Sequence, residues 1–216
     1  MFRFAFTWLM VYAAASAFQP QAGSADSEQE KDVYAIYSLM LTNPKTSHGP
    51  YESERLLIAI TTRPVSLHPS CTRPPNDREA EFREVLADYE HRKTTPRQLK
   101  PLFSIPKPYM LLTDDEVRAF SEEQMRPFAQ QDDRFRDVSD YFTLGDVYFN
   151  KAGTLALTAF SSWCGGLCAQ SQWKIFEKAD NGKWVEHQWG LCGTIAENLG
   201  WKRPDRRTSR TLSFWS

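Results

Sequence analysis

Polar residues at the spacing of helix starts precede apolar residues at helical spacing at several points in the chain. Ser27-x-x-Glu30 has the spacing of a capping box, and the apolar positions after it continue at helical intervals up to Asn43-Pro44. The same spacing recurs at Asn76-x-x-Glu79 and at Thr113-x-x-Glu116, each time ahead of an amphipathic stretch. These patterns predict a helix after each start.

Two short apolar runs, Leu56–Thr62 and Tyr109–Leu112, lie between the predicted helices. The first is rich in β-branched residues and is typical of a buried strand, and the second predicts another short strand. From about Tyr141 the apolar period changes from helical to alternating, which favours an antiparallel sheet in the C-terminal part of the chain.

The loop Lys151–Gly153 predicts the register of a first hairpin, because its glycine suits the left-handed position of a three-residue turn. Pairing across this loop places Phe149 beside Leu155 and Tyr141 beside Trp163.

The loop Asp180–Gly182 has the same pattern and places Val185 beside Glu177 and His187 beside Ile175. A two-residue Asn-Gly turn would shift this register by one and oppose Val185 with a lysine, so burial favours the three-residue loop.

The hairpin between these two is closed by the residues Cys164 to Cys168, and a register with the cysteines opposed places Leu157 beside Ile175. We therefore expect an α+β fold in which a C-terminal four-stranded antiparallel β-meander packs against N-terminal helices. The expected core face of the sheet consists of Val147, Phe149, Leu155, Leu157, Trp173, Ile175, Val185 and Trp189.

The opposite face of the predicted sheet mixes polar and aromatic side chains, as recognition surfaces do. Its members are Asp146, Tyr148, Phe160, Lys174, Phe176, Trp184 and Gln188, which we interpret as a candidate binding face. The alternative is a solvated face that carries only weak cross-strand pairs.

Residues 1–17 have the layout of a signal peptide, with one arginine, an apolar run and a final Ala15-Ser16-Ala17. An uncleaved N-terminal anchor is the alternative, and no later apolar run has the length of a transmembrane span. We expect a secreted or periplasmic protein with one α+β domain over residues 26–200 and a basic, flexible tail over residues 201–216.

Export makes disulfides the expected state of the four cysteines. Among the three connectivities, opposed strand positions favour Cys164 with Cys168, which leaves Cys71 with Cys192. A thiol redox site and a zinc site are weaker alternatives, because the chain lacks a Cys-x-x-Cys motif. We expect no metal and no cofactor.

Composition and motifs narrow the function. The chain has 216 residues, 41% of them hydrophobic, and a formal net charge of -1, which gives no reason to expect a nucleic-acid partner. Gly-x-Ser-x-Gly and His-Glu-x-x-His motifs are absent, His187 falls on the predicted core face, and Asp114, Asp115 and Glu116 look like first-turn helix residues.

These observations favour a non-catalytic binding or interaction module of the cell envelope, whose partner is a protein or an envelope ligand. The alternative is an envelope enzyme, with a hydrolase ahead of a thiol-disulfide oxidoreductase. The oligomeric state stays open.

The C-terminal half also carries a set of short motifs: DVYFNKAGTLAL at 146–157, CGGLC at 164–168, WKIFEK at 173–178 and NGKW at 181–184. Together with YMLLTDDE at 109–116, they resemble a loose group of exported bacterial proteins of unassigned function. The resemblance implies an exported α+β domain and no known reaction.

Overall fold

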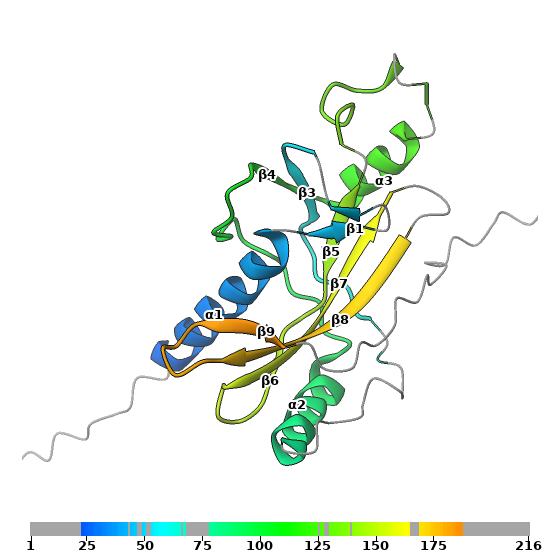
Figure 1. Ribbon diagram of the computed structural model, residues 1–216. Coiled ribbons are helices and arrows are strands. Elements are labelled where there is room, and N and C mark those ends of the chain that lie inside the picture. The colour runs from blue at the N-terminus through cyan, green and yellow to red at the C-terminus, as the bar shows by residue number, and fades with distance from the viewer. Residues whose placement is uncertain are drawn as a thin grey trace, which may run out of the picture.

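The computed structural model in Figure 1 describes residues 23–42, 44–46, 49–50, 53–65, 67, 78–124, 126–127, 130–138, 140–164 and 169–187. Its helices are α1 (Gly23–Thr42), α2 (Glu79–Arg92) and α3 (Asp114–Glu123). Its strands are β1 (Lys45–Thr46), β2 (Gly49–Pro50), β3 (Leu56–Ala59), β4 (Tyr109–Leu112), β5 (Tyr141–Leu144), β6 (Tyr148–Phe149), β7 (Leu155–Trp163), β8 (Ala169–Lys178) and β9 (Trp184–His187). The predicted signal peptide at 1–17 and the predicted tail at 201–216 lie outside these residues.

Seven of the described strands form the main sheet, in the order β4–β3–β5–β7–β8–β9, with β6 also paired to β7, and β1 and β2 form a separate pair. Strand β3 is parallel to β4 and β5, and the other pairs are antiparallel. The predicted α+β class is confirmed, but the four-stranded antiparallel meander is wrong, because the sheet is larger and partly parallel. Helix α2 lies between β3 and β4 in the chain, and such a crossover lets two neighbouring strands run in the same direction.

A bulge shifts the register of the first C-terminal hairpin by one residue. Tyr141 pairs with Trp163 as predicted, but Phe149 pairs with Ala156 rather than with Leu155. The predicted three-residue loop is therefore wrong, because Asn150 lies opposite Leu155 and the loop holds four residues, 151–154. The shift arises at residues 145–147, which lie opposite only two residues of β7. Because side chains alternate between faces, this one-residue shift also reverses the face of every side chain in β6.

The other two hairpins have the predicted register. Leu157 lies beside Ile175, and Val185 lies beside Glu177. Gly182 has a φ of 76°, the left-handed conformation that the three-residue loop requires.

Helices α2 and α3 cover one face of the sheet. Leu155 and Leu157 of β7 belong to the apolar cluster under α2. Further along the same face, the Phe120 ring of α3 contacts the rings of Tyr141 and Trp163. Odd-numbered residues of β7 therefore point toward α2 and α3.

Helix α1 covers the opposite face (Figure 1). The Trp184 indole of β9 donates a hydrogen bond of 2.9 Å to Asp32 of this helix. Because helices cover both faces, the prediction of an exposed aromatic binding face is wrong. Its four aromatic members are buried: Tyr148, Phe160, Phe176 and Trp184. Tyr148 lies under α2 because of the bulge, and the other three lie on the α1 face.

Two residues of the edge strand β9 that were predicted to lie in the core are exposed. Val185 is 47% exposed, because α2 lies over β6 and β7 and does not extend to the sheet edge. His187, predicted to be a core histidine, is also exposed, and its Nε2 lies 3.5 Å from Glu177 Oε2. Trp189 and Gln188 lie outside the described residues.

Of the three predicted capping boxes, the one at the start of α3 is confirmed. The Glu116 N–H donates to the Thr113 hydroxyl at 3.3 Å, and the Thr113 N–H donates to the Glu116 carboxylate at 2.8 Å. Helix α1 begins at Gly23, ahead of the predicted start at Ser27. The predicted cap of α2 at Asn76 lies outside the described residues.

Candidate functional site

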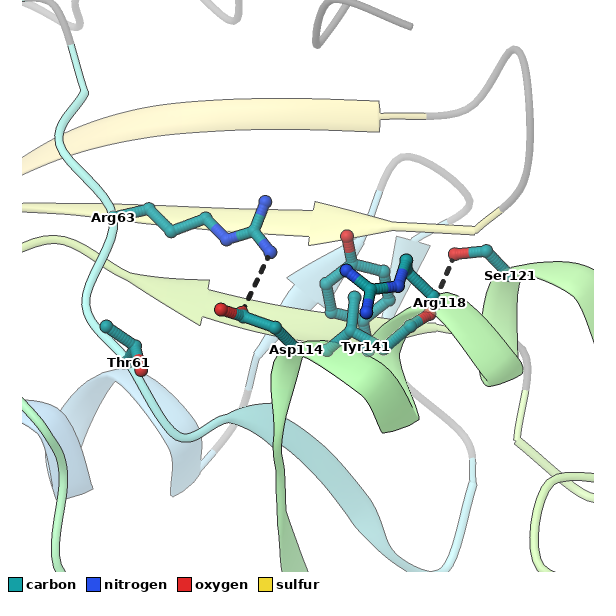
Figure 2. A pocket seen from close by; sticks show the side chains of 7 residues that line it. Thr61, Arg63, Asp114, Arg118, Ser121 and Tyr141 are labelled. Atoms are coloured by element: carbon teal, nitrogen blue, oxygen red, sulfur yellow. Dashed lines mark hydrogen bonds and ion pairs between the residues drawn. The ribbon is translucent and has the colours of Figure 1, made fainter.

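A pocket of about 390 Å³ lies between helix α3 and the sheet (Figure 2). The described residues that line it are Thr61, Arg63, Asp114, Val117, Arg118, Ser121 and Tyr141. Because β3 and β4 are parallel neighbours, the segments that follow them leave the sheet at the same edge. Ligand sites of sheets with parallel strands are common at that edge, and this volume suits a small molecule.

Arg63 and Asp114 form an ion pair at the mouth of the pocket, with 3.6 Å between Nη2 and Oδ1. The Arg63 N–H donates to the Leu144 carbonyl at 2.9 Å, which holds the segment after β3 beside β5. Asp114 is the first residue of α3, directly after the capping Thr113. Their side chains are 43% and 69% exposed, so the pair contributes less than about 1 kcal/mol, and the Arg63 guanidinium stays accessible.

Helix α3 supplies a second guanidinium to the pocket wall and a hydroxyl that already donates a hydrogen bond within the helix. Arg118 pairs with Asp115 on the helix surface, and its side chain is 67% exposed. The Ser121 hydroxyl donates a hydrogen bond of 3.0 Å to the Val117 carbonyl. The pocket wall therefore offers the charge of Arg118, whereas the proton of Ser121 is already used within the helix.

Tyr141 is a largely buried residue of the pocket wall. The residue is 6% exposed, and its ring lies 5.8 Å from the Phe120 ring and 5.4 Å from the Trp163 ring, measured between centroids. Within the described part of the chain, its hydroxyl has no hydrogen-bond partner. In the view of Figure 2, the hydroxyl lies between the guanidinium groups of Arg63 and Arg118.

The charge state of Tyr141 follows from its surroundings. Burial raises the pKa of its hydroxyl, the positive charge of Arg63 lowers this pKa, and the negative charge of Asp114 raises it. The net shift is upward, so the hydroxyl keeps its proton at neutral pH and acts as a hydrogen-bond donor.

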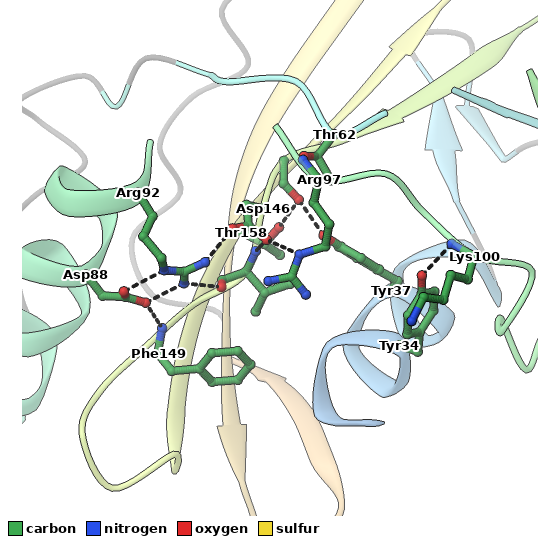
Figure 3. Close-up of polar contacts among 12 residues, drawn as sticks. Tyr34, Tyr37, Thr62, Asp88, Arg92, Arg97, Lys100, Asp146, Phe149 and Thr158 are labelled. Carbon is green, nitrogen blue, oxygen red and sulfur yellow. Dashed lines mark hydrogen bonds and ion pairs between the residues drawn. The ribbon is translucent and has the colours of Figure 1, made fainter. Parts of the chain in front are cut away.

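A second polar cluster joins α2 to the bulge (Figure 3). The buried Asp146 carboxylate forms ion pairs with Arg92 and with Arg97, the latter at 3.2 Å from Nε to Oδ1, and accepts the Val147 N–H at 3.0 Å. Arg92 also pairs with Asp88 at 2.5 Å. The positive and negative charges of this cluster balance and contact one another, which is typical of a structural cluster.

The polar members of the predicted binding face are not gathered into one site. Asp146 belongs to the cluster under α2, and Lys174 forms an ion pair of 2.6 Å with Glu186 on the outer strands. Gln188 lies outside the described residues.

The predicted disulfide residues are described only at Cys164, which is disulfide-bonded. Cys71, Cys168 and Cys192 lie outside the described residues, so the pairing stays a prediction. In the part of the chain that the structure describes, no cluster of three or more metal-ligating side chains occurs. Within the same part, none of the helices has the length and apolarity needed to cross a membrane.

Sequence reasoning missed Arg63, Arg118 and Tyr141 as site residues. The available signal was the predicted strand before Arg63 and the predicted strand-to-helix step at Thr113. Had the two strands been paired in parallel, Arg63 and the start of the helix would have been expected at one sheet edge.

The chain has no recognised relative in the comparisons. No protein-family model, curated protein or solved structure matches it.

Proposed function

We propose that this chain is a non-catalytic binding module of the cell envelope, and that it binds a small ligand in the pocket between α3 and β5. The observation that carries the proposal is Tyr141, a largely buried residue whose hydroxyl lines the pocket and has no hydrogen-bond partner among the described residues. The hydroxyl oxygen is open to solvent through the pocket, so a ligand that accepts its proton replaces water there.

The chemistry of the pocket wall supports binding over catalysis. The Ser121 hydroxyl already donates to the Val117 carbonyl, and the upward pKa shift of Tyr141 disfavours the anion that a base or nucleophile needs. The described lining residues include no histidine. Two guanidiniums, a carboxylate and a protonated phenol instead provide fixed recognition groups.

Fragment screening by two-dimensional NMR tests this proposal. We expect binding fragments to shift the amide signals of Thr61, Val117 and Tyr141 in the wild-type protein. Thr61→Phe fills the pocket and should abolish these shifts, whereas Thr94→Phe, at an exposed position outside the pocket, should preserve them.

Two results would contradict the proposal. The first is a screen in which no fragment shifts the pocket signals, or in which Thr61→Phe binds as well as Thr94→Phe. The second is hydrolysis of p-nitrophenyl acetate that Thr61→Phe abolishes and Thr94→Phe retains, which would favour the hydrolase alternative.

The envelope location rests on residues 1–17 and is tested separately. Expression of the full chain in a bacterium, followed by cell fractionation and N-terminal sequencing, should yield a protein outside the cytoplasm that begins after Ala17. A full-length protein confined to the cytoplasm would contradict export and leave the pocket proposal unchanged.

A further inference from the structure

The charged side chains that line the pocket are unequal in sign, and this inequality indicates which ligands it accepts. Arg63 and Arg118 contribute two positive charges to the lining and Asp114 contributes one negative charge, whereas Asp115, the ion-pair partner of Arg118, lies outside the lining. The guanidinium of arginine binds planar oxyanions in a two-pronged geometry, and the protonated Tyr141 hydroxyl adds a third donor. All three groups favour an acceptor with negative charge.

We propose that the ligand carries a single carboxylate, which accepts hydrogen bonds from Arg63, Arg118 and the Tyr141 hydroxyl. This inference rests on the proposed function and specifies its ligand class. A carboxylate brings one negative charge, which balances the net positive charge of the lining. A phosphate dianion would instead leave an excess of negative charge beside Asp114.

The rest of the pocket suits an apolar body attached to that carboxylate. The Val117 side chain is buried in the wall, and the Tyr141 ring packs against Phe120 and Trp163 behind it. A small aromatic carboxylate would place its charged group between the guanidiniums and its ring against these apolar surfaces.

Four probes of similar shape and different charge test the inference: benzoate, benzamide, phenyl phosphate and benzylamine. We expect benzoate to shift the Thr61, Val117 and Tyr141 amide signals, with an affinity at least about ten-fold above that of each other probe. Equal or tighter binding of benzamide, benzylamine or phenyl phosphate in the pocket would overturn the carboxylate assignment and leave the proposed function standing.

Variants separate charge recognition from a structural effect. Arg118→Gln and Tyr141→Phe should each weaken benzoate binding about ten-fold or more, whereas Arg83→Gln, on the exposed face of α2, should not change it. Asp114→Asn removes the negative charge of the lining and should strengthen benzoate binding about two- to five-fold. Weaker benzoate binding by Asp114→Asn, with the fold intact by circular dichroism, would contradict the inference.

The remaining outcomes are also decisive. If none of the four probes binds, carboxylates among the pocket-binding fragments of the larger screen would support the inference, and exclusively neutral or cationic fragments would overturn it. If neither set contains a pocket ligand, the proposed function itself fails.

Discussion

Substitution of the buried Asp146 is the most exacting test of the fold, because this residue lies in the bulge that shifts the register of the first hairpin. Its side chain is 7% exposed and contacts Arg92 and Arg97, whose side chains are 24% and 35% exposed. Asp146→Asn preserves the shape and the acceptor for the Val147 N–H, but it removes the negative charge between two guanidiniums.

Removing one partner of a buried ion pair costs about 3–5 kcal/mol. Here water still reaches both guanidiniums, so we expect Asp146→Asn to lower the free energy of unfolding by about 2–3 kcal/mol. For a domain of this size, that loss corresponds to a fall in melting temperature of roughly 4–12 °C.

Urea unfolding followed by tryptophan fluorescence measures this loss, with an unchanged dependence on urea concentration as the sign that the two end states are preserved. Glu186→Gln is the matched control, because its partner Lys174 lies on the outer strands and the pair is partly exposed; its cost should stay below about 1 kcal/mol. If Asp146→Asn is no less stable than this control, the cluster does not hold α2 to the bulge.

Further predictions concern the bulge, the loss of stability at low pH and the edge strand β9. Gly145→Ala should lower the free energy of unfolding by about 1–3 kcal/mol, because its new Cβ would lie 3.0 Å from the Ala159 Cβ; wild-type stability in urea would refute this. Burial of Asp88 raises the pKa of its carboxyl, but the hydrogen bonds from Arg92 and from the Phe149 N–H outweigh this effect and hold the pKa below the usual value. The ionised carboxylate therefore stabilises the fold above pH about 4, and this stabilisation is lost as the pH falls further. Asp88→Asn should therefore be less stable than the wild type at pH 7 and lose less stability on acidification; parallel pH profiles would contradict this. Trp184→Phe should lower the free energy of unfolding by about 1–3 kcal/mol, because it loses the hydrogen bond to Asp32. Val185→Thr, at an exposed position of β9, should change the free energy of unfolding by less than about 0.5 kcal/mol. Equal losses in the two variants would contradict the exposed position of Val185.

Local features of the fold were predictable from the sequence because their physical causes are local. The capping pair Thr113 and Glu116 needs only a short segment to form its hydrogen bonds. The left-handed glycines Gly153 and Gly182 mark the positions of their turns in the same way, with φ values of 65° and 76°, but only the loop at Gly182 has the predicted length. The register of β7 against β8 followed from a short hairpin loop.

The errors arose where distant segments decide the outcome. The parallel pairing of β3 with β4 and β5 depends on chain crossovers, for which no single segment carries a signal. The bulge at residues 145–147 is stabilised by α2 through Arg92, and its omission placed Tyr148 and Phe149 of β6 on the wrong faces of the sheet. Tyr141 was correctly paired with Trp163, but its role depends on Arg63 and α3, which approach it only in the folded chain.

A crystal structure with bound benzoate is the most direct test of carboxylate binding in the pocket. We predict electron density for the ligand in the pocket between α3 and β5, with a carboxylate oxygen within about 3.2 Å of the Tyr141 hydroxyl oxygen. Benzoate bound elsewhere on the molecule, with the Tyr141 hydroxyl still unpaired at saturating concentration, would contradict it.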